Sequence, residues 1–235
     1  MHQQHSRTAA LIGETALSKL AHARVAVFGI GGVGGYITEA LARAGVGALD
    51  LIDSDEVSVS NINRQIIALH STVGRPKVAV MAERIRDINP DCTVRTYERL
   101  YLPENADEFD LPVYDYIADA IDTVSAKIEL AVRARALNVP IIAAMGAGNK
   151  LDPTAFEVSD ISKTTVCPLA RVMRLELRRR GVNHLKVVYS KEPPVTAGVS
   201  DEGGIRRNVP TSISFVPGAM GLIMASEIVK DLMAK

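Results

Sequence analysis

Short continuous runs of apolar residues alternate along the first two-thirds of the chain with segments whose apolar residues recur every three or four positions. Short runs of this kind are typical of buried strands, and the wider spacing is typical of helices. The expected strands span residues 25–28, 48–52, 93–97, 114–118 and 141–144, and the expected helices span residues 34–44, 77–88 and 126–137. This alternation predicts an α/β fold with a doubly wound, Rossmann-like and mostly parallel sheet.

Further elements flank this expected sheet on both sides. Residues 8–20 have helical spacing, and we expect an N-terminal helical arm over residues 1–22. A C-terminal extension over residues 151–235 contains an expected helix at 168–180, a strand at 187–189, an irregular loop at 193–208 and a helix at 217–233. A length of 235 residues is within the range of one domain, so we expect a single domain over residues 1–235.

Composition and charge exclude some classes of protein. Hydrophobic residues make up 47% of the chain, and 27 basic residues balance 27 acidic ones, so any surface that holds nucleic acid must be a local patch. Two cysteines cannot build a disulfide framework and no secretory leader is recognisable, which favours a cytoplasmic protein. The longest apolar stretch, residues 213–229, contains Pro217 and Glu227, so we expect a buried helix and no stable membrane association.

The segment FGIGGVGGY at residues 28–36 joins the first expected strand to the first expected helix. Gly29, Gly31 and Gly34 fit the pattern G-x-G-x-x-G, in which the glycines permit a tight turn, the approach of a phosphate and close helix packing. Asp53 follows the next strand, where a carboxylate can accept hydrogen bonds from a ribose. The pattern indicates an adenosine phosphate without distinguishing NAD from ATP, and a glycine turn needed only for packing would also produce it.

Charged residues downstream of Asp53 favour a triphosphate. Arg64 and Lys77 can neutralise phosphates and Asn61 can donate a hydrogen bond, whereas both phosphates of a dinucleotide lie over the glycine loop. Lys77 stands at the expected start of a helix, where the helix dipole disfavours a cation unless an anion binds nearby. Asp122 follows another expected strand, and its position fits both a magnesium ligand and a helix cap. Alternatively, Arg64 and Lys77 are ordinary solvated charges.

Several motifs resemble those of the ubiquitin-activating-like adenylating enzymes, a group that includes the activators of sulfur-carrier proteins. They are GIGGVGGY, AGVG, the acid pair Asp53 and Asp55, SNINRQ, VGRPKV and DAIDT. The resemblance implies that ATP and magnesium are used to activate a carboxylate. The implied roles are phosphate contacts by Gly32 and its neighbours and by Asn61, Arg64 and Lys77, ribose binding by Asp53 beside Asp55, and magnesium binding by Asp122. The resemblance also implies a homodimer in which Arg7 of the arm enters the partner's site and acts there with Arg64, Lys77 and Asp122.

The C-terminal part narrows the resemblance to the tRNA threonylcarbamoyladenosine dehydratases. The matching segments are DPT at 152–154, DISKT at 160–164, Pro168 with Arg171 and Arg174, and SFVPGAMGLIMA at 214–225. Enzymes of this family use ATP to close the threonylcarbamoyl side chain of adenosine 37 in certain tRNAs into a ring, with loss of water. The chain has no C-x-x-C pair for a thiolate zinc site. It departs from the family pattern at Cys167, where we expect an aspartate, and the thiol is either a nucleophile or a small core side chain.

Basic residues gather in the same C-terminal part. Residues 163–191 contain eight lysines and arginines against one glutamate. Lys163, Arg171, Arg174 and Arg178 are the expected tRNA contacts, and the three arginines fall on one face of the expected helix. Such a stripe can follow a phosphate backbone, which would make binding sensitive to salt. A solvated helix face without any RNA would explain the same charges.

The sequence leaves functions of three classes open. The leading one is ATP-dependent dehydration of threonylcarbamoyladenosine in tRNA through an acyl-adenylate. The second is adenylation of the C-terminus of a small ubiquitin-like or sulfur-carrier protein, which needs the same nucleotide site. The third is a nucleotide-binding module without turnover. An NAD-dependent dehydrogenase ranks below these, because no acid–base group stands where a nicotinamide would lie.

Overall fold

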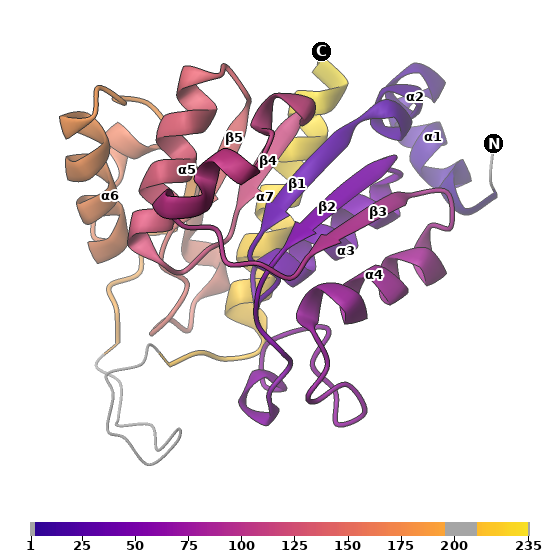
Figure 1. Cartoon of the computed structure of the whole chain (residues 1–235), viewed down its shortest axis with the longest axis horizontal. Coiled ribbons are helices and arrows are strands. Elements are labelled where there is room, and N and C mark those ends of the chain that lie inside the picture. Colours follow the sequence, from indigo (N-terminus) through magenta and orange to yellow (C-terminus); the bar gives the residue numbers. More distant parts are fainter. Residues whose placement is uncertain (1–2, 196–210, 235) are drawn as a thin grey trace.

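A seven-stranded sheet forms the centre of the protein in a computed structural model that describes residues 3–195 and 211–234 (Figure 1). Its strands are β1 (Arg24–Phe28), β2 (Ala48–Ile52), β3 (Thr93–Tyr97), β4 (Tyr116–Asp119), β5 (Ile141–Ala144), β6 (Phe156–Asp160) and β7 (Lys186–Ser190). Their order is β3-β2-β1-β4-β5-β7-β6, and every neighbouring pair is parallel except β6 with β7. This arrangement confirms the expected doubly wound, mostly parallel sheet.

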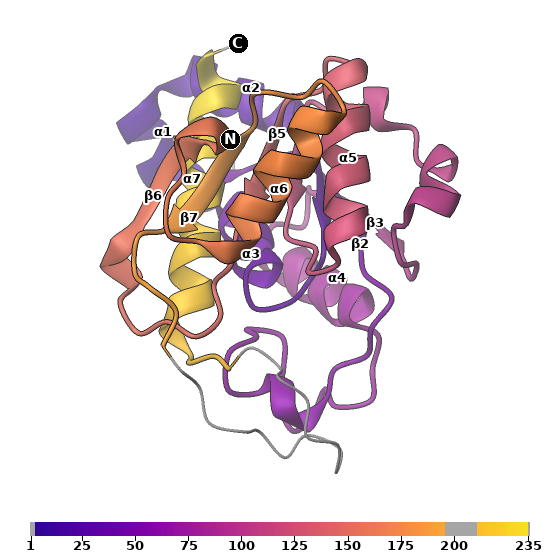
Figure 2. The same cartoon turned by 90° about the vertical axis from the view of Figure 1, so that its left-hand side faces the viewer.

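Helices cover both faces of the sheet (Figures 1 and 2). Helices α3 (Gly34–Ala44), α4 (Lys77–Ile88) and α7 (Phe215–Ala234) pack on one face, and α5 (Val124–Ala136) and α6 (Pro168–Arg179) pack on the other. Successive side chains of a strand point to opposite faces. In β1, Val25 and Val27 therefore join the core beneath α3 and α7, while Ala26 and Phe28 join the core beneath α5. Both faces are apolar, which explains the continuous apolar runs in the sequence.

Short 3₁₀ helices precede or connect the other elements. They are η1 (Gln3–His5), η2 (Val59–Asn61), η3 (Pro103–Glu108), η4 (Leu111–Val113), η5 (Pro153–Ala155) and η6 (Ile161–Lys163). Among the described residues, no helix combines the length and the apolar character needed to cross a membrane.

The N-terminal arm differs from its expected form. It consists of two helices, α1 (Ser6–Ile12) and α2 (Glu14–His22), where the sequence predicted a single helix. Gly13 separates them because its φ of 84° lies in the left-handed region, which breaks the helical path. Helix α2 contacts the last helix, α7, so the arm lies against the body of the protein.

The C-terminal extension is built into the same sheet. Strand β7 inserts between β5 and β6, and α7 packs along α3, the helix that follows the glycine loop. Strand β6 has no counterpart among the expected elements. Residues 196–210, which include most of the expected irregular loop at 193–208, lie outside the described residues.

The order of the strands places a topological switch point at β1. Strand β1 has β2 on one side and β4 on the other, so the chain winds in opposite directions from this point. Ligands of open α/β sheets bind in the crevice at such a point, at the edge formed by the carboxyl ends of the strands. The segments that follow β1, β2 and β4 meet here, and they contain the glycine loop, Asp53 and Asp122.

Candidate nucleotide-binding site

Two of the loop glycines are required by the fold itself. Gly29 has a φ of 89°, and a Cβ atom on it would lie 2.6 Å from the carbonyl oxygen of Ala120. A Cβ atom on Gly34 would lie 1.7 Å from the carbonyl oxygen of Gly29. The first and third glycines of the pattern therefore serve the tight turn and the packing of α3, as the sequence predicted.

Gly31 has no comparable requirement within the described part of the chain. Its φ is not in the left-handed region, and the described atom nearest to a Cβ added on it would be the Nε2 atom of Gln65, at 3.8 Å. The next residue, Gly32, is closer to its neighbours, because its added Cβ would lie 3.2 Å from Pro217 and 3.5 Å from the Cγ atom of Arg64. The backbone at Gly31 is thus open beside the start of α3, where N–H groups and the helix dipole attract an anion.

Asp53 connects the carboxyl end of β2 to this loop. Its Oδ2 atom accepts a hydrogen bond from the backbone N–H of Ile30 at 2.6 Å, and its Oδ1 atom accepts one from Asp55 at 2.8 Å. Burial raises the pKa of the Asp53 carboxyl, although the nearby Lys77 ammonium and both N–H groups oppose this shift. Each carboxylate oxygen keeps further acceptor capacity, so the side chain can also accept from a ribose hydroxyl.

Lys77 is the first residue of α4 and its side chain is buried. Its Nζ atom lies 2.7 Å from the Oδ2 atom of Asp55. The lysine therefore points to the carboxyl end of β2 and not into bulk water. The sequence predicted an anion beside this helix start, and within the chain the Asp55 carboxylate takes that position.

Arg64 and Asn61 belong to the turn around η2. The Oδ1 atom of Asn61 accepts from the backbone N–H of Ser58 at 3.1 Å, which leaves the amide NH₂ group as the donor that the sequence interpretation requires. The aliphatic part of Arg64 lies beside Gly32, while its Nη1 atom donates to the carbonyl of Ser60 at 3.0 Å and to Oδ1 of Asn63 at 2.8 Å. The stem of Arg64 thus lies next to the glycine loop, whereas its guanidinium group bonds to residues of its own turn.

Asp122 lies in the connection from β4 to α5 and is exposed. It does not cap α5: the N-cap residue is Thr123, and the hydroxyl of Thr123 is 3.4 Å from Oδ1 of Asp122. Within the described residues no group of three or more histidine, cysteine or acidic side chains can hold a metal ion. Magnesium commonly binds through one or two carboxylates together with substrate phosphates, and a single open carboxylate at this edge fits that mode.

The structure reveals polar groups at this edge to which the sequence interpretation gave no role. Gln65 is 7% exposed, and its Oε1 atom is buried without a hydrogen-bond partner among the described residues. Asp119 and Lys127 form a fully buried ion pair behind the loop that contains Asp122. Gln65 and Asp119 both stand inside motifs quoted from the sequence, SNINRQ and DAIDT, but only their burial distinguishes them.

The remaining predicted site residues lie elsewhere. Arg7 is exposed on α1, and Figure 1 shows the arm at the end of the sheet opposite the segment between β2 and α4 that contains Arg64. Within one chain, the structure does not bring Arg7 to the other site residues. Cys167 is buried in the core between α5 and α6, which favours the interpretation as a small core side chain.

The predicted tRNA contacts lie on η6 and α6. Lys163, Arg171 and Arg178 are exposed, and among the described residues none of the three forms an ion pair. Arg174 is half-buried instead: its Nη1 atom donates to the hydroxyl of Thr164 at 2.6 Å and to the carbonyl of Thr164 at 3.0 Å. The guanidinium of Arg174 therefore joins α6 to η6.

Comparison with known proteins gives a consistent result over the whole chain. The ThiF family matches residues 5–235. The tRNA threonylcarbamoyladenosine dehydratase of Bacillus subtilis is 43% identical over 99% of this chain and 96% of its own length. Crystal structures of the E. coli tRNA N6-threonylcarbamoyladenosine dehydratase, TcdA, in complex with AMP and with ATP are 38% and 39% identical, with TM-scores of 0.90 and 0.89. Each of these two alignments covers 99% of this chain and 94% of the E. coli chain. The chain thus belongs to the ThiF family, in the group of the tRNA threonylcarbamoyladenosine dehydratases.

Proposed function

We propose that the protein is an ATP-dependent tRNA threonylcarbamoyladenosine dehydratase, which closes the threonylcarbamoyl side chain of adenosine 37 into a ring with loss of water. The open backbone at Gly31 carries the nucleotide part of this proposal, because none of the residues that the structure describes occupies the space that the missing side chain leaves. The relatives carry the substrate part, since they match almost the whole chain and are named for this reaction.

The chemistry explains why ATP is needed. A carboxylate resists attack by a nucleophile because of its charge. Attack of the threonyl carboxylate on the α-phosphorus of ATP releases pyrophosphate and forms an acyl-adenylate. The carbamoyl group of the same side chain then attacks the activated carbonyl, and AMP leaves with the oxygen that is lost from the substrate. Because this attack is intramolecular, its effective molarity is high and the enzyme needs no covalent nucleophile.

The residues at the crevice suit the binding and charge stabilisation that such a reaction requires. The backbone N–H groups at the start of α3 would bind phosphate, and Asp53 would hold the ribose. Arg64 would exchange its bonds to Ser60 and Asn63 for phosphate oxygens, and Lys77 would add a second positive charge. Asp122 would hold magnesium, which supplies further neutralisation of the phosphate charge when it is bound.

The partners follow from the same proposal. The tRNA would contact the exposed cations Lys163, Arg171 and Arg178, and the reaction would take place in the cytoplasm, where its substrate is found. We further propose a homodimer in which Arg7 of each chain enters the site of the other, because the arm that contains Arg7 lies at the end of the sheet opposite the segment between β2 and α4 (Figure 1).

Mass spectrometry of the modified nucleoside tests the proposal. The purified protein is incubated with ATP, magnesium and tRNA that carries threonylcarbamoyladenosine. We expect the nucleoside to lose one water molecule with the wild-type protein and with Arg86→Ala, an exposed arginine on α4, but not with Arg64→Ala. No loss of water with the wild-type protein would reject the dehydratase. Pyrophosphate exchange that a carrier protein stimulates and tRNA does not would favour the adenylation of a carrier.

A further inference from the structure

A fully buried ion pair lies directly behind the loop that contains Asp122. The Nζ atom of Lys127, on α5, is 2.9 Å from the Oδ2 atom of Asp119, the last residue of β4. Both side chains have zero exposure. The second oxygen of the carboxylate, Oδ1, accepts a hydrogen bond from the backbone N–H of Ile121 at 3.2 Å.

Stability alone does not account for this pair. Removing two charges from water is costly, and replacement of a buried pair by apolar side chains of similar volume is often neutral or stabilising. The protein also contains a comparison: Asp50 on β2 is equally buried, but its partner Arg24 is 22% exposed and stays partly hydrated. Of these two ion pairs, Asp119–Lys127 has no contact with water, and it is the pair that lies beside the nucleotide crevice.

The location of the pair indicates what it does. The Asp119 carboxylate accepts from the N–H group two residues ahead, which ties its side chain to the backbone of the segment that follows β4. This segment packs against the glycine loop: a Cβ atom on Gly29 would lie 2.6 Å from the carbonyl oxygen of Ala120 and 3.1 Å from the N atom of Ile121. Asp122 is the next residue of the segment. The side chain of Asp119 therefore sets the direction in which the chain reaches Asp122, and Lys127 holds that side chain in place.

We propose that Asp119 and Lys127 are positioning residues, which hold the connection from β4 to α5 so that the Asp122 carboxylate faces the phosphates of the bound nucleotide. Neither side chain reaches the ligand, because neither is exposed. The inference rests on the proposed function, in which Asp122 binds magnesium with the nucleotide. It predicts that the pair matters for the effect of magnesium on nucleotide binding and not for stability.

Calorimetric measurement of ATP binding, with magnesium and with EDTA, tests this inference on the full chain. The ratio of the two dissociation constants is the magnesium effect. Asp119→Leu/Lys127→Met replaces both charged side chains by apolar ones, so no unpaired ion is left buried. We expect this variant to keep the wild-type unfolding temperature and to lose about tenfold or more of the magnesium effect, the usual scale for residues that orient a metal ligand. Asp119→Asn/Lys127→Met restores an acceptor for Ile121 and should recover most of the effect.

Two further variants make the outcomes distinct. Asp122→Asn should lose the magnesium effect to at least the same extent as Asp119→Leu/Lys127→Met. Asp50→Asn breaks the comparison pair, and it should lower the unfolding temperature without changing the magnesium effect. An unchanged magnesium effect in Asp122→Asn would remove the metal role from the proposed function. An unchanged effect in Asp119→Leu/Lys127→Met beside a lost effect in Asp122→Asn would overturn the positioning inference alone.

Discussion

The glycines of the loop illustrate how the same residue serves two purposes. Gly34 is needed because the helix start lies against the carbonyl of Gly29, and the fold cannot form with a side chain there. Gly31 has room for a side chain among the described residues. Under the proposed function, a ligand that approaches the backbone explains why Gly31 lacks a side chain, and the two positions should then respond differently to the same substitution.

Gly31→Ala should weaken ATP binding by about tenfold or more, because the added methyl group occupies space that a phosphate needs. Its stability should be unchanged or higher by about 0.4–1 kcal/mol, since alanine loses less backbone entropy on folding than glycine. Calorimetry with ATP and urea unfolding measure the two effects. Gly34→Ala is the matched control and should prevent folding, because its Cβ would lie 1.7 Å from a carbonyl oxygen. Wild-type affinity in Gly31→Ala would contradict a phosphate at this position.

The hydrogen bonds of Arg64 are a residue-scale feature that the sequence does not predict. Its place in SNINRQ predicts a charge near the phosphates, and its stem does lie beside Gly32. Its bonds to Ser60 and Asn63 depend on side-chain torsions and on the exact path of the turn, which no residue pattern determines. The sequence also does not predict the Gln65 oxygen that lacks a partner among the described residues, or the buried pair Asp119–Lys127, because burial is a property of the folded chain.

Helix α6 combines a structural cation with exposed ones. The sequence placed Arg171, Arg174 and Arg178 on one face, but Arg174 donates to Thr164 and so fixes η6 against the helix. Arg179 and Arg180 are paired with Glu176, at 2.6 Å each. Among the described residues, Arg171 and Arg178 are therefore the arginines of α6 that have neither a carboxylate partner nor a bond to η6, and a phosphate backbone would meet these two.

Arg171→Gln/Arg178→Gln should lower the affinity for tRNA and reduce the slope of log K against log salt concentration by up to about two, one for each phosphate contact. Stability should change by less than about 0.5 kcal/mol, because both side chains are exposed. Filter binding over a range of salt concentrations measures the slope. Arg174→Gln, the control, should instead lower the free energy of unfolding by about 1–3 kcal/mol. A wild-type slope in the double variant would show that α6 is a solvated face.

Most elements of the sheet core are predictable because their signals are local. The expected bounds of α3, β2, α4, β3 and β5 agree with the observed ones, since each element has its own apolar run or helical spacing bounded by glycine, proline or polar residues. Strand β6 was missed because it is an edge strand with only Phe156 and Val158 as apolar residues, and its pairing with β7 involves distant sequence. The break at Gly13 was missed because the helical spacing continues across it.

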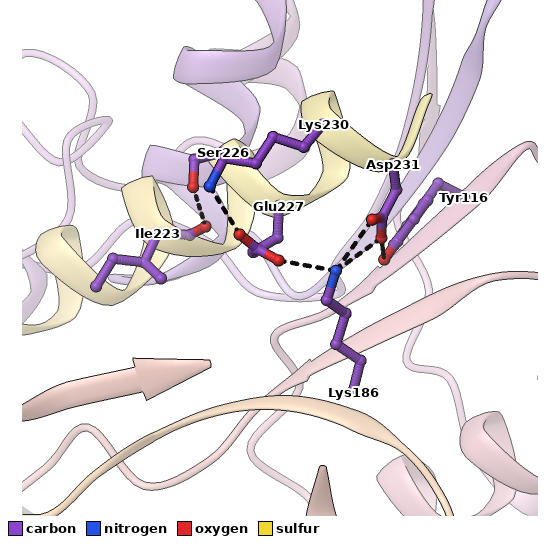
Figure 3. A network of polar contacts seen from close by, with 7 residues as sticks. All are labelled: Tyr116, Lys186, Ile223, Ser226, Glu227, Lys230 and Asp231. Carbon is purple, nitrogen blue, oxygen red and sulfur yellow. Dashed lines mark hydrogen bonds and ion pairs between the residues drawn. The ribbon is translucent and has the colours of Figure 1, made fainter. Parts of the chain in front are cut away.

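The last helix is fastened to the sheet by a polar network (Figure 3). Lys186 of β7 bonds to Glu227 at 2.8 Å and to Asp231 at 2.9 Å, and Tyr116 of β4 donates to Asp231 at 2.6 Å. The hydrogen bond from Lys186 lowers the pKa of Glu227, with a smaller contribution from Lys230. Partial burial alone would lower the pKa of Lys186, but its bonds to the two carboxylates raise it. The attachment of α7 to the strands β4 and β7 thus depends on side chains of opposite charge.

The network predicts a pH dependence of stability. The contribution of Glu227, whose folded pKa is depressed, is complete above its ordinary pKa of 4.5 and is lost as the pH falls through the folded value. The contribution of Lys186, whose folded pKa is raised, is complete below its ordinary pKa of 10.5 and is lost as the pH rises through the folded value. Lys186→Met should therefore cost about 1–3 kcal/mol of unfolding free energy at pH 7, and less as the pH falls through the folded pKa of Glu227.

Urea unfolding of the wild type and the variant over a series of pH values measures this cost. Lys230→Met is the matched control, because Lys230 also pairs with Glu227 but is 64% exposed; it should cost at most about 1 kcal/mol. A cost for Lys186→Met that is the same at acid and neutral pH would contradict an electrostatic origin and would leave packing of the lysine stem as the cause.

In the whole molecule, the N-terminal arm and the segment between β2 and α4 that contains Arg64 lie at opposite ends of the sheet (Figure 1). An Arg7 side chain on α1 cannot serve its own glycine loop without the arm detaching from α7. If Arg7 acts on the reaction, it acts in a second copy of the chain. A two-fold dimer would then contain two sites, each with Arg64 from one chain and Arg7 from the other.

Complementation between two inactive variants tests this arrangement. Arg7→Ala and Arg64→Ala should each abolish dehydration, because every site lacks one arginine. After subunits exchange in an equal mixture, half of the dimers are mixed, and one of their two sites has both arginines, so about a quarter of the wild-type activity should return. A mixture of Arg7→Ala with Arg7→Ala/Arg64→Ala is the control and should stay inactive, since no pairing restores both residues. An equally inactive mixture of the two single variants, with exchange verified by mass spectrometry, would show that Arg7 does not act across the dimer.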